Sequence, residues 1–328
     1  MNKRVKIVGF DVNINDCYML REELAANGIS CDLAKVDDFS SYGNLHGLKR
    51  LREALRKENE SATVFIPSLM NAELYLEEPD FSIMVSGYSS WYAPNRVKII
   101  PPLWTPSPAP GEAELKEIKW SKKPDLCVGF MGNSFEGSKV ARLTSYLPSF
   151  FKKKILEGRH LTYSSLIIGC NGAKVPLTLL SCFARIEAIR KLEATSLKKD
   201  IVKCSWFKGS SEEVKKFKNH LMRNTYILCP RGAENYSFRF YETLAFGRIP
   251  VLIDTNMVLP PNVNWDELCV RIPYEHLSEL ENIIRTDYEK HTESDFIERQ
   301  EKALQTMKEL SKKLWLKDIV VEIASSVQ

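Results

Sequence analysis

The sequence predicts an α/β protein with two Rossmann-like domains. Its 328 residues exceed the length of one typical domain. In each half, short apolar runs alternate with amphipathic segments, which is typical of βαβ units in a parallel sheet. Apolar residues make up 44% of the chain and aromatic residues 10%, enough to fill buried cores. We therefore expect two parallel sheets, one from each half.

The amino-terminal half is expected to begin with a strand, a helix and a second strand. These are Val5–Phe10, Asp16–Ala26, which Asn27-Gly28 closes, and Ile29–Val36. A helix and three strands are expected to follow, at His46–Glu58, Thr63–Ile66, Phe81–Val85 and Val97–Ile100. No glycine-rich phosphate loop follows the first strand, so a nucleotide is expected to bind to the other half.

The stretch from Ile100 to Pro110 is the most proline-dense in the chain. Proline favours an extended, semi-rigid path, so we place the crossing between the halves over Pro101–Pro124. The alternative is a surface loop inside one domain. We expect a first domain over residues 1–110, a linker over 111–124 and a second domain over 125–310. Residues 311–328 are expected to form a C-terminal helix that packs back on the first domain.

The second half is expected to restart with the strand Leu126–Met131, followed at Ser138–Leu147 by a helix. Its most informative stretch is Thr225–Asp254, in which two apolar strands flank a helix that Asn235 or Ser237 caps. The remaining elements are expected at Leu166–Gly169 and Asp200–Phe207 (strands) and at Leu177–Leu192, His276–Arg285 and Asp295–Trp315 (helices).

Charged residues mark the stretch Thr225–Asp254 as a candidate anion site. Arg231 precedes the helix, and Arg239 and Glu242 lie three residues apart on it. The amino end of such a helix carries unpaired N–H groups and a partial positive charge, and arginine binds phosphate in a bidentate manner. Glu242 can accept hydrogen bonds from vicinal hydroxyls, as in a ribose. The alternative is a surface ion pair of Arg239 with Glu242.

These residues resemble the signature of the exostosin family of glycosyltransferases, family 47. The resemblance lies in Pro230-Arg-Gly, Ser237, Arg239-Phe-Tyr-Glu242, Gly247 and Ile249-Pro-Val251, and continues through Leu259-Pro-Pro and Asn264–Pro273. Weaker similarity occurs at Val128–Asn133, with Arg142, and at Phe65-Ile-Pro67. Animal and plant exostosins typically carry a membrane anchor, whereas this chain looks more like the soluble members of bacteria and large DNA viruses.

The resemblance implies a GT-B architecture, in which two Rossmann-like domains face each other across a cleft. It also implies inverting transfer of a sugar from a nucleotide sugar to a glycan hydroxyl, with UDP favoured over GDP as the nucleotide. Arg231 and Arg239 are expected to stabilise the departing diphosphate, together with Ser237. Glu242 is expected to bind the ribose or the sugar. Asn133 and Arg142 are further donor-binding candidates, and Glu234 is either a sugar contact or a solvated loop residue.

The catalytic base is expected in the amino-terminal half, which would bind the acceptor. Asp80 resembles the aspartate of a weaker family motif, Gly-Arg-Asp-His, although its neighbours differ. Asp11 and Glu73 are rivals, because each follows a predicted strand, and a solvated, non-catalytic Asp80 is the remaining alternative. No Asp-x-Asp motif is present, so activity without a bound metal ion is expected.

Composition limits the partners and the compartment. The net charge of +4 is small, so no nucleic-acid partner is expected. Lys152–Lys154, beside Phe150 and Phe151, is interpreted as a helix end with a solvated face. The eight cysteines form no CxxC pair, which favours reduced thiols. No signal peptide or membrane span is predicted, so a soluble, cytoplasmic protein is expected. The oligomeric state stays open.

Two other classes of function stay open. A non-catalytic partner of an active glycosyltransferase would keep Arg231 and Glu242 but tolerate loss of the amino-half carboxylates. A Rossmann-type oxidoreductase or a kinase is disfavoured, because the sequence contains neither Gly-x-Gly-x-x-Gly nor a Gly-Lys-Ser/Thr loop.

Overall fold

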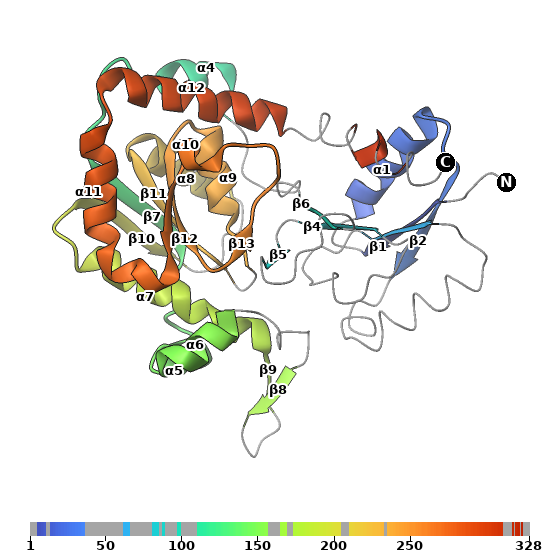
Figure 1. The fold of residues 1–328 in the computed structure, drawn as a ribbon, viewed down its shortest axis with the longest axis horizontal. Helices are drawn as coiled ribbons and strands as arrows, with labels where there is room; N and C mark the ends of the chain where they lie inside the picture. The colour runs from blue at the N-terminus through green and yellow to red at the C-terminus, as the bar shows by residue number, and fades with distance from the viewer. Residues whose placement is uncertain are drawn as a thin grey trace.

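The structure is a computed structural model. It describes residues 5–10, 14–36, 62–65, 81–84, 87–88, 97–99, 110–156, 165–168, 173–204, 210–232 and 235–310, and, near the carboxyl end, residues 317, 319–321 and 323. Figure 1 shows two α/β units, with the first sheet on the right and the larger second unit on the left.

The first unit contains a five-stranded parallel sheet in the order β2-β1-β3-β4-β6. Its strands are β1 (Val5–Phe10), β2 (Cys31–Val36), β3 (Ala62–Phe65), β4 (Phe81–Met84) and β6 (Val97–Ile99). Helix α1 (Ile14–Ala26) packs Leu20 and Leu24 against Val5 and Ile7 of β1. The same buried cluster includes three residues from near the carboxyl end, Ile319, Val320 and Ile323.

The second unit contains another five-stranded parallel sheet, in the order β10-β7-β11-β12-β14. Its strands are β7 (Cys127–Asn133), β10 (Lys198–Cys204), β11 (Tyr226–Pro230), β12 (Ile249–Asp254) and β14 (Val270–Pro273). In both sheets the first strand lies between the second and the third, and the later strands extend on one side. The structure thus confirms the α/β class with two Rossmann-like units, the GT-B architecture.

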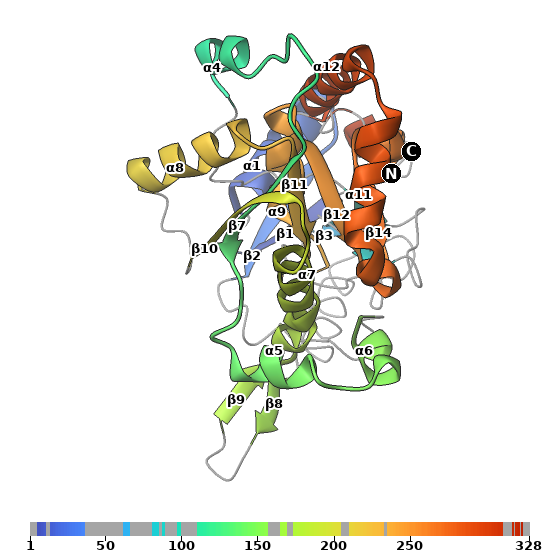
Figure 2. The same cartoon turned by 90° about the vertical axis from the view of Figure 1, so that its left-hand side faces the viewer.

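Helices cover both faces of the second sheet (Figures 1 and 2). One face packs against α7 (Phe183–Glu193) and α11 (Leu280–Lys290), and the other against α8 (Ser211–Met222) and α9 (Phe238–Ala245). Helix α12 (Glu293–Glu309) contributes to both clusters, with Phe296 in the first and Ala303 in the second. Strand β11 shows why both faces of the sheet need covering. Because side chains alternate along a strand, Tyr226 and Leu228 pack with the cluster of α7, while Ile227 and Cys229 pack with that of α9. A strand buried on both faces reads as a continuous apolar run, which is how the sequence revealed it.

The remaining elements connect these layers. They are β5 (Gly87–Tyr88), α4 (Glu112–Glu117), α5 (Lys139–Thr144), α6 (Ser149–Leu156), β8 (Ser165–Ile168), β9 (Ala173–Pro176), η3 (Leu177–Cys182), β13 (Met257–Val258), α10 (Trp265–Leu268) and η4 (Tyr274–Glu279). Strand β13, after β12, pairs antiparallel with β5 of the first unit. The segment that follows β12 is therefore hydrogen-bonded, main chain to main chain, to the amino-terminal half.

Several expected elements differ from the observed ones. The helix expected over Leu177–Leu192 begins with a 3₁₀ segment, η3, before α7. The one expected over Ser138–Leu147 ends at Thr144, and α12 ends at Glu309 rather than near Trp315. The expected helix His46–Glu58 lies outside the described residues. Within the described ranges, no helix is long and apolar enough to cross a membrane, and all seven cysteines are free thiols.

Candidate active site

The topology of the second sheet singles out the carboxyl ends of β7 and β11. The chain goes from β7 to β10 on one side and then returns to β11 on the other. In open α/β sheets, ligands bind beyond the carboxyl ends of the strands at such a reversal. Asn133 ends β7 and Pro230 ends β11, so the segment that contains Arg231 starts at this point.

Arg185, on α7, joins the ends of these two strands. Its Nη1 donates to the main-chain oxygen of Asn133 (3.1 Å), its Nη2 to that of Pro230 (2.9 Å) and its Nε to that of Arg231 (2.7 Å). Burial, followed by the neighbouring charge of Arg239, lowers the pKa of Arg185 to about 10, and Arg231 contributes in the same direction. Arg185 therefore stays charged at neutral pH and adds positive potential to this edge of the sheet.

Arg231 is buried directly after β11, with 2% of its surface exposed. Its Nη1 donates to Asn235 Oδ1 (3.3 Å), which also accepts from Thr255 Oγ1 (2.6 Å) beyond the end of β12. The N–H of Gly232 donates to the main-chain oxygen of Tyr236 (2.9 Å). These bonds join Arg231 and Gly232 to residues that precede α9 and follow β12, so the cation of Arg231 is positioned by the fold.

Arg239, in the first turn of α9, is a half-buried cation whose polar contacts are incomplete. Its guanidinium carbon lies 4.8 Å from the ring centre of Phe217 and 5.7 Å from that of Phe130. Among the described residues, none accepts a hydrogen bond from its Nε or Nη1, although both atoms are shielded from solvent. Buried charged groups are normally paired, and a ligand anion would supply the missing acceptor.

Gly132, in β7, makes room for this guanidinium. A Cβ atom at Gly132 would lie 3.3 Å from both Nη1 and Nη2 of Arg239. Ser237, which caps α9, is buried and makes no side-chain capping bond to the helix. The amino end of α9 and the guanidinium of Arg239 thus both lie near the carboxyl ends of β7 and β11, a region that we call the corner. Unpaired helix N–H groups and cations both favour an anion there.

The other expected donor-binding residues lie in different settings. Asn133 Oδ1 accepts from the N–H of Phe135 (2.8 Å) and shapes the turn after β7. Glu242 is half-buried on α9, and it forms no ion pair with Arg239, a residue that the structure also describes. Arg142 is exposed on α5 and, within the described part of the chain, makes no side-chain hydrogen bond. Asp80, Asp11, Glu73 and Glu234 lie outside the described residues.

Arg185 was not among the residues that the sequence singled out. The signal was a lone arginine between Phe183-Ala184 and Ile186, in the middle of the helix predicted over Leu177–Leu192. A cation that interrupts a buried face needs acceptors, but the sequence does not show which strand ends supply them. The three hydrogen bonds of Arg185, which we call the Arg185 clamp, depend on a tertiary contact between α7 and two strands.

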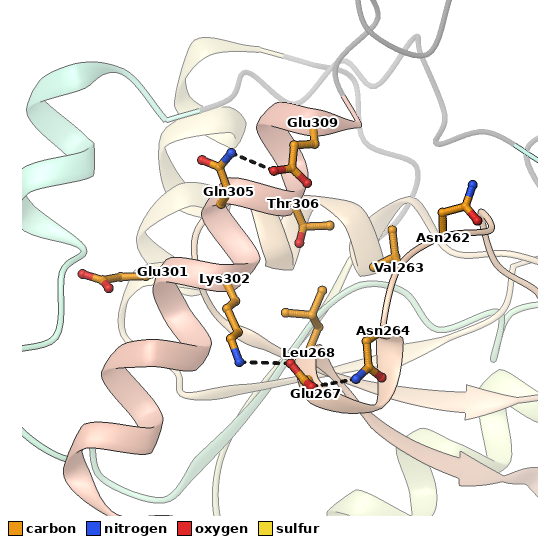
Figure 3. A pocket seen from close by; sticks show the side chains of 10 residues that line it. All are labelled: Asn262, Val263, Asn264, Glu267, Leu268, Glu301, Lys302, Gln305, Thr306 and Glu309. Atoms are coloured by element: carbon orange, nitrogen blue, oxygen red, sulfur yellow. Dashed lines mark hydrogen bonds and ion pairs between the residues drawn. The ribbon is translucent and has the colours of Figure 1, made fainter. Parts of the chain in front are cut away.

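A separate hollow of about 440 Å³ lies between α10, with its preceding loop, and α12 (Figure 3). Five of its polar side chains are paired with one another. Lys302 pairs with Glu267 (3.1 Å), and the Nε2 of Gln305 donates to the carboxylate of Glu309 (2.8 Å). None of its lining residues belongs to the arginine cluster.

Comparison with known proteins connects this site to glycosyltransferases. The exostosin GT47 domain matches residues 185–286, a range that contains all three arginines of the site. A rice protein named as a probable glucuronosyltransferase is 34% identical over 80 residues, which cover 24% of this chain and 18% of that protein. An Arabidopsis thaliana protein named as a probable β-1,4-xylosyltransferase is 31% identical over 80 residues, covering 24% of this chain and 19% of that protein.

The matched segment thus spans less than a fifth of these curated relatives. The match supports the expected similarity to exostosin glycosyltransferases, and these plant relatives give no support to a viral or bacterial type. Two solved structures align over nearly the whole chain. A glycosyltransferase from Rickettsia africae is 11% identical with a TM-score of 0.42, and the alignment covers 99% of this chain and 98% of that one. Anabaena HepE, solved in complex with UDP and glucose, is 9% identical with a TM-score of 0.40, and the alignment covers 98% of this chain and 99% of that one.

Proposed function

We propose that this chain is an inverting glycosyltransferase that moves a sugar from a nucleotide diphosphate sugar, with UDP favoured, to a glycan hydroxyl. The observation that carries the proposal is Arg239, a shielded cation with open donor positions, beside Arg185 and Arg231 at the topological switch of a Rossmann-like sheet. A diphosphate fits this corner because it supplies several anionic acceptors to guanidiniums and helix N–H groups. The exostosin match over the same residues supports it.

The reaction follows as a single displacement. The acceptor hydroxyl oxygen attacks the anomeric carbon, while the bond from that carbon to the diphosphate oxygen breaks and its electron pair leaves with the diphosphate. Arg231 and Arg239, with Ser237 and the amino end of α9, neutralise the charge that develops there. The hydroxyl proton goes to a carboxylate of the first domain, for which Asp80 is our first candidate, followed by Asp11 and Glu73.

The donor would be held in the second domain and the acceptor in the first, with residues 1–110 and 125–310 as their proposed extents. Glu242 would bind the ribose or sugar hydroxyls, and Asn133 and Arg142 would add donor contacts. No metal ion is needed in this scheme, because the arginines and the helix end stabilise the leaving group. The names of the plant relatives make glucuronic acid and xylose the first sugars to test.

The direct test is calorimetry with UDP, followed by a transfer assay with a panel of UDP- and GDP-sugars on glycan acceptors. The expected result is binding of UDP by the purified chain and turnover of one donor. Binding that is unchanged in Arg231→Ala would contradict the assigned site. Tight donor binding without hydrolysis or transfer would indicate the non-catalytic partner instead.

A further inference from the structure

Five of the seven large apolar side chains that are exposed in the described part of the chain lie within nine residues. They are Leu143, Tyr146, Leu147, Phe150 and Phe151, which we call the 143–151 patch, and their exposed fractions run from 37% to 77%. The patch includes the turn between α5 and α6, at one edge of the second unit (Figures 1 and 2). Such a concentration is unusual, because exposed apolar residues are normally scattered.

Basic residues surround the patch. Lys139 precedes it, Lys153 and Lys154 follow it, and all three are exposed. No acidic residue occurs between Lys139 and Leu156. The Nζ of Lys154 lies 4.4 Å from the ring centre of Phe150, so charge and aromatic surface are presented together. Lys152, in contrast, pairs with Glu187 of α7 (2.7 Å).

The exposure of the patch follows from how its inner face is held. Ala141 and Leu156 are buried in small clusters with Cys182, Phe183 and Ile186, and Thr144 Oγ1 donates to the main-chain oxygen of Leu180 (3.1 Å). Both short helices are thus fixed to η3 and α7 by their small or aliphatic residues. The aromatic residues point outward because the inner positions are already filled.

We propose that the 143–151 patch docks this protein on the surface of an anionic phospholipid bilayer. An interfacial segment buries aromatic and aliphatic side chains at the boundary between headgroups and acyl chains, while flanking lysines contact lipid phosphates. The patch supplies both parts in one fixed surface. This inference does not depend on the proposed reaction, since none of the patch residues touches the arginine cluster in the structure.

The test is sedimentation of the full chain with vesicles of phosphatidylcholine, alone or with about one third phosphatidylserine. We expect binding to the anionic vesicles only, weakened by added salt. Each lysine near a bilayer contributes about fivefold, so Lys153→Gln with Lys154→Gln is expected to weaken binding on the order of 20-fold. Phe150→Ser with Phe151→Ser is expected to weaken it by at least about tenfold.

The matched control is Lys119→Gln with Lys122→Gln, which removes two exposed charges elsewhere and is expected to bind like the wild type. Thermal melting checks each variant, and Tyr146→Ser replaces any double variant that does not fold. Equal binding to both kinds of vesicle, equal losses in the control, or binding of a single-stranded RNA oligonucleotide without vesicle binding would each overturn the proposal.

Discussion

The Nε of Arg185 donates to the main-chain oxygen of Arg231 over 2.7 Å, so the backbone of one arginine of the site holds the side chain of another. This bond, with those to Asn133 and Pro230, fixes cations next to each other before any ligand arrives. Like charges held together raise the energy of the empty site, and an anionic ligand lowers it.

Replacement of Arg239 by methionine is expected to weaken UDP binding and to leave the melting temperature unchanged or higher. The loss of a charge-assisted contact is worth about 2 kcal/mol, a roughly 30-fold weaker affinity. Removal of an incompletely paired, shielded cation favours the folded state. Calorimetry with UDP and thermal melting measure the two effects. A variant that binds UDP normally would remove Arg239 from the site.

Alanine at Gly132 and at Gly129 forms a matched pair within β7. A Cβ at Gly132 meets the guanidinium of Arg239 at 3.3 Å, whereas one at Gly129 meets Asn224 at 2.7 Å and His220 at 2.8 Å. Gly132→Ala is therefore expected to weaken UDP binding by several-fold with little loss of stability. Gly129→Ala is expected to cost about 1–3 kcal/mol of unfolding free energy through overpacking, with UDP affinity of the folded protein retained. The reverse pattern would contradict the assigned position of Arg239.

Arg185→Ala is expected to lower both stability and UDP affinity, because three main-chain carbonyls lose their donor. The expected loss is about 3 kcal/mol of unfolding free energy in urea denaturation. Arg185→Lys keeps the charge but cannot reach all three carbonyls, so it is expected to recover UDP affinity more than stability. A fully stable Arg185→Ala protein would show that the clamp does not hold the strand ends.

Replacement of each candidate base by its amide tests which carboxylate of the first domain accepts the proton. Asp80→Asn is expected to leave UDP affinity unchanged and to abolish transfer, because a base contributes typically 100-fold or more to the rate. Asp11→Asn and Glu73→Gln serve as parallel variants in the same assay. Normal turnover in Asp80→Asn would eliminate that residue and transfer the role to whichever rival variant is inactive.

The pH dependence of stability has a defined contribution from Glu281. Hydrogen bonds from the Ser196 side chain, the Ser196 N–H and Arg285 lower the pKa of this carboxyl from 4.5 to about 2. Its contribution is therefore present above about pH 4.5 and is lost as the pH falls towards 2. We expect Glu281→Gln to lower the melting temperature at pH 7 but to match the wild type near pH 2. A constant difference across this range would contradict the shift.

The sequence predicted the inner strands of the second sheet well, because β7, β11 and β12 are buried along nearly their whole length and read as apolar runs, as in Tyr226–Cys229. It also placed Arg231 before the start of α9 and Arg239 in its first turn, since their order around a helix start follows from local chain geometry. It missed Arg185, whose role depends on contact with two distant strand ends. The end of α5 at Thr144 and the start of α7 after η3 were missed for a similar reason, because tertiary packing rather than propensity decides where these helices stop.

One short helix, α7, carries the Arg185 clamp in its first turn and also supports α5 and α6 through Phe183 and Ile186. The proposed lipid-facing turn and the proposed nucleotide site are consequently both attached to α7. If the protein rests on a bilayer, its donor site sits at a constant height and tilt above the headgroups. Acceptors would then be selected by their reach from the membrane as well as by their chemistry.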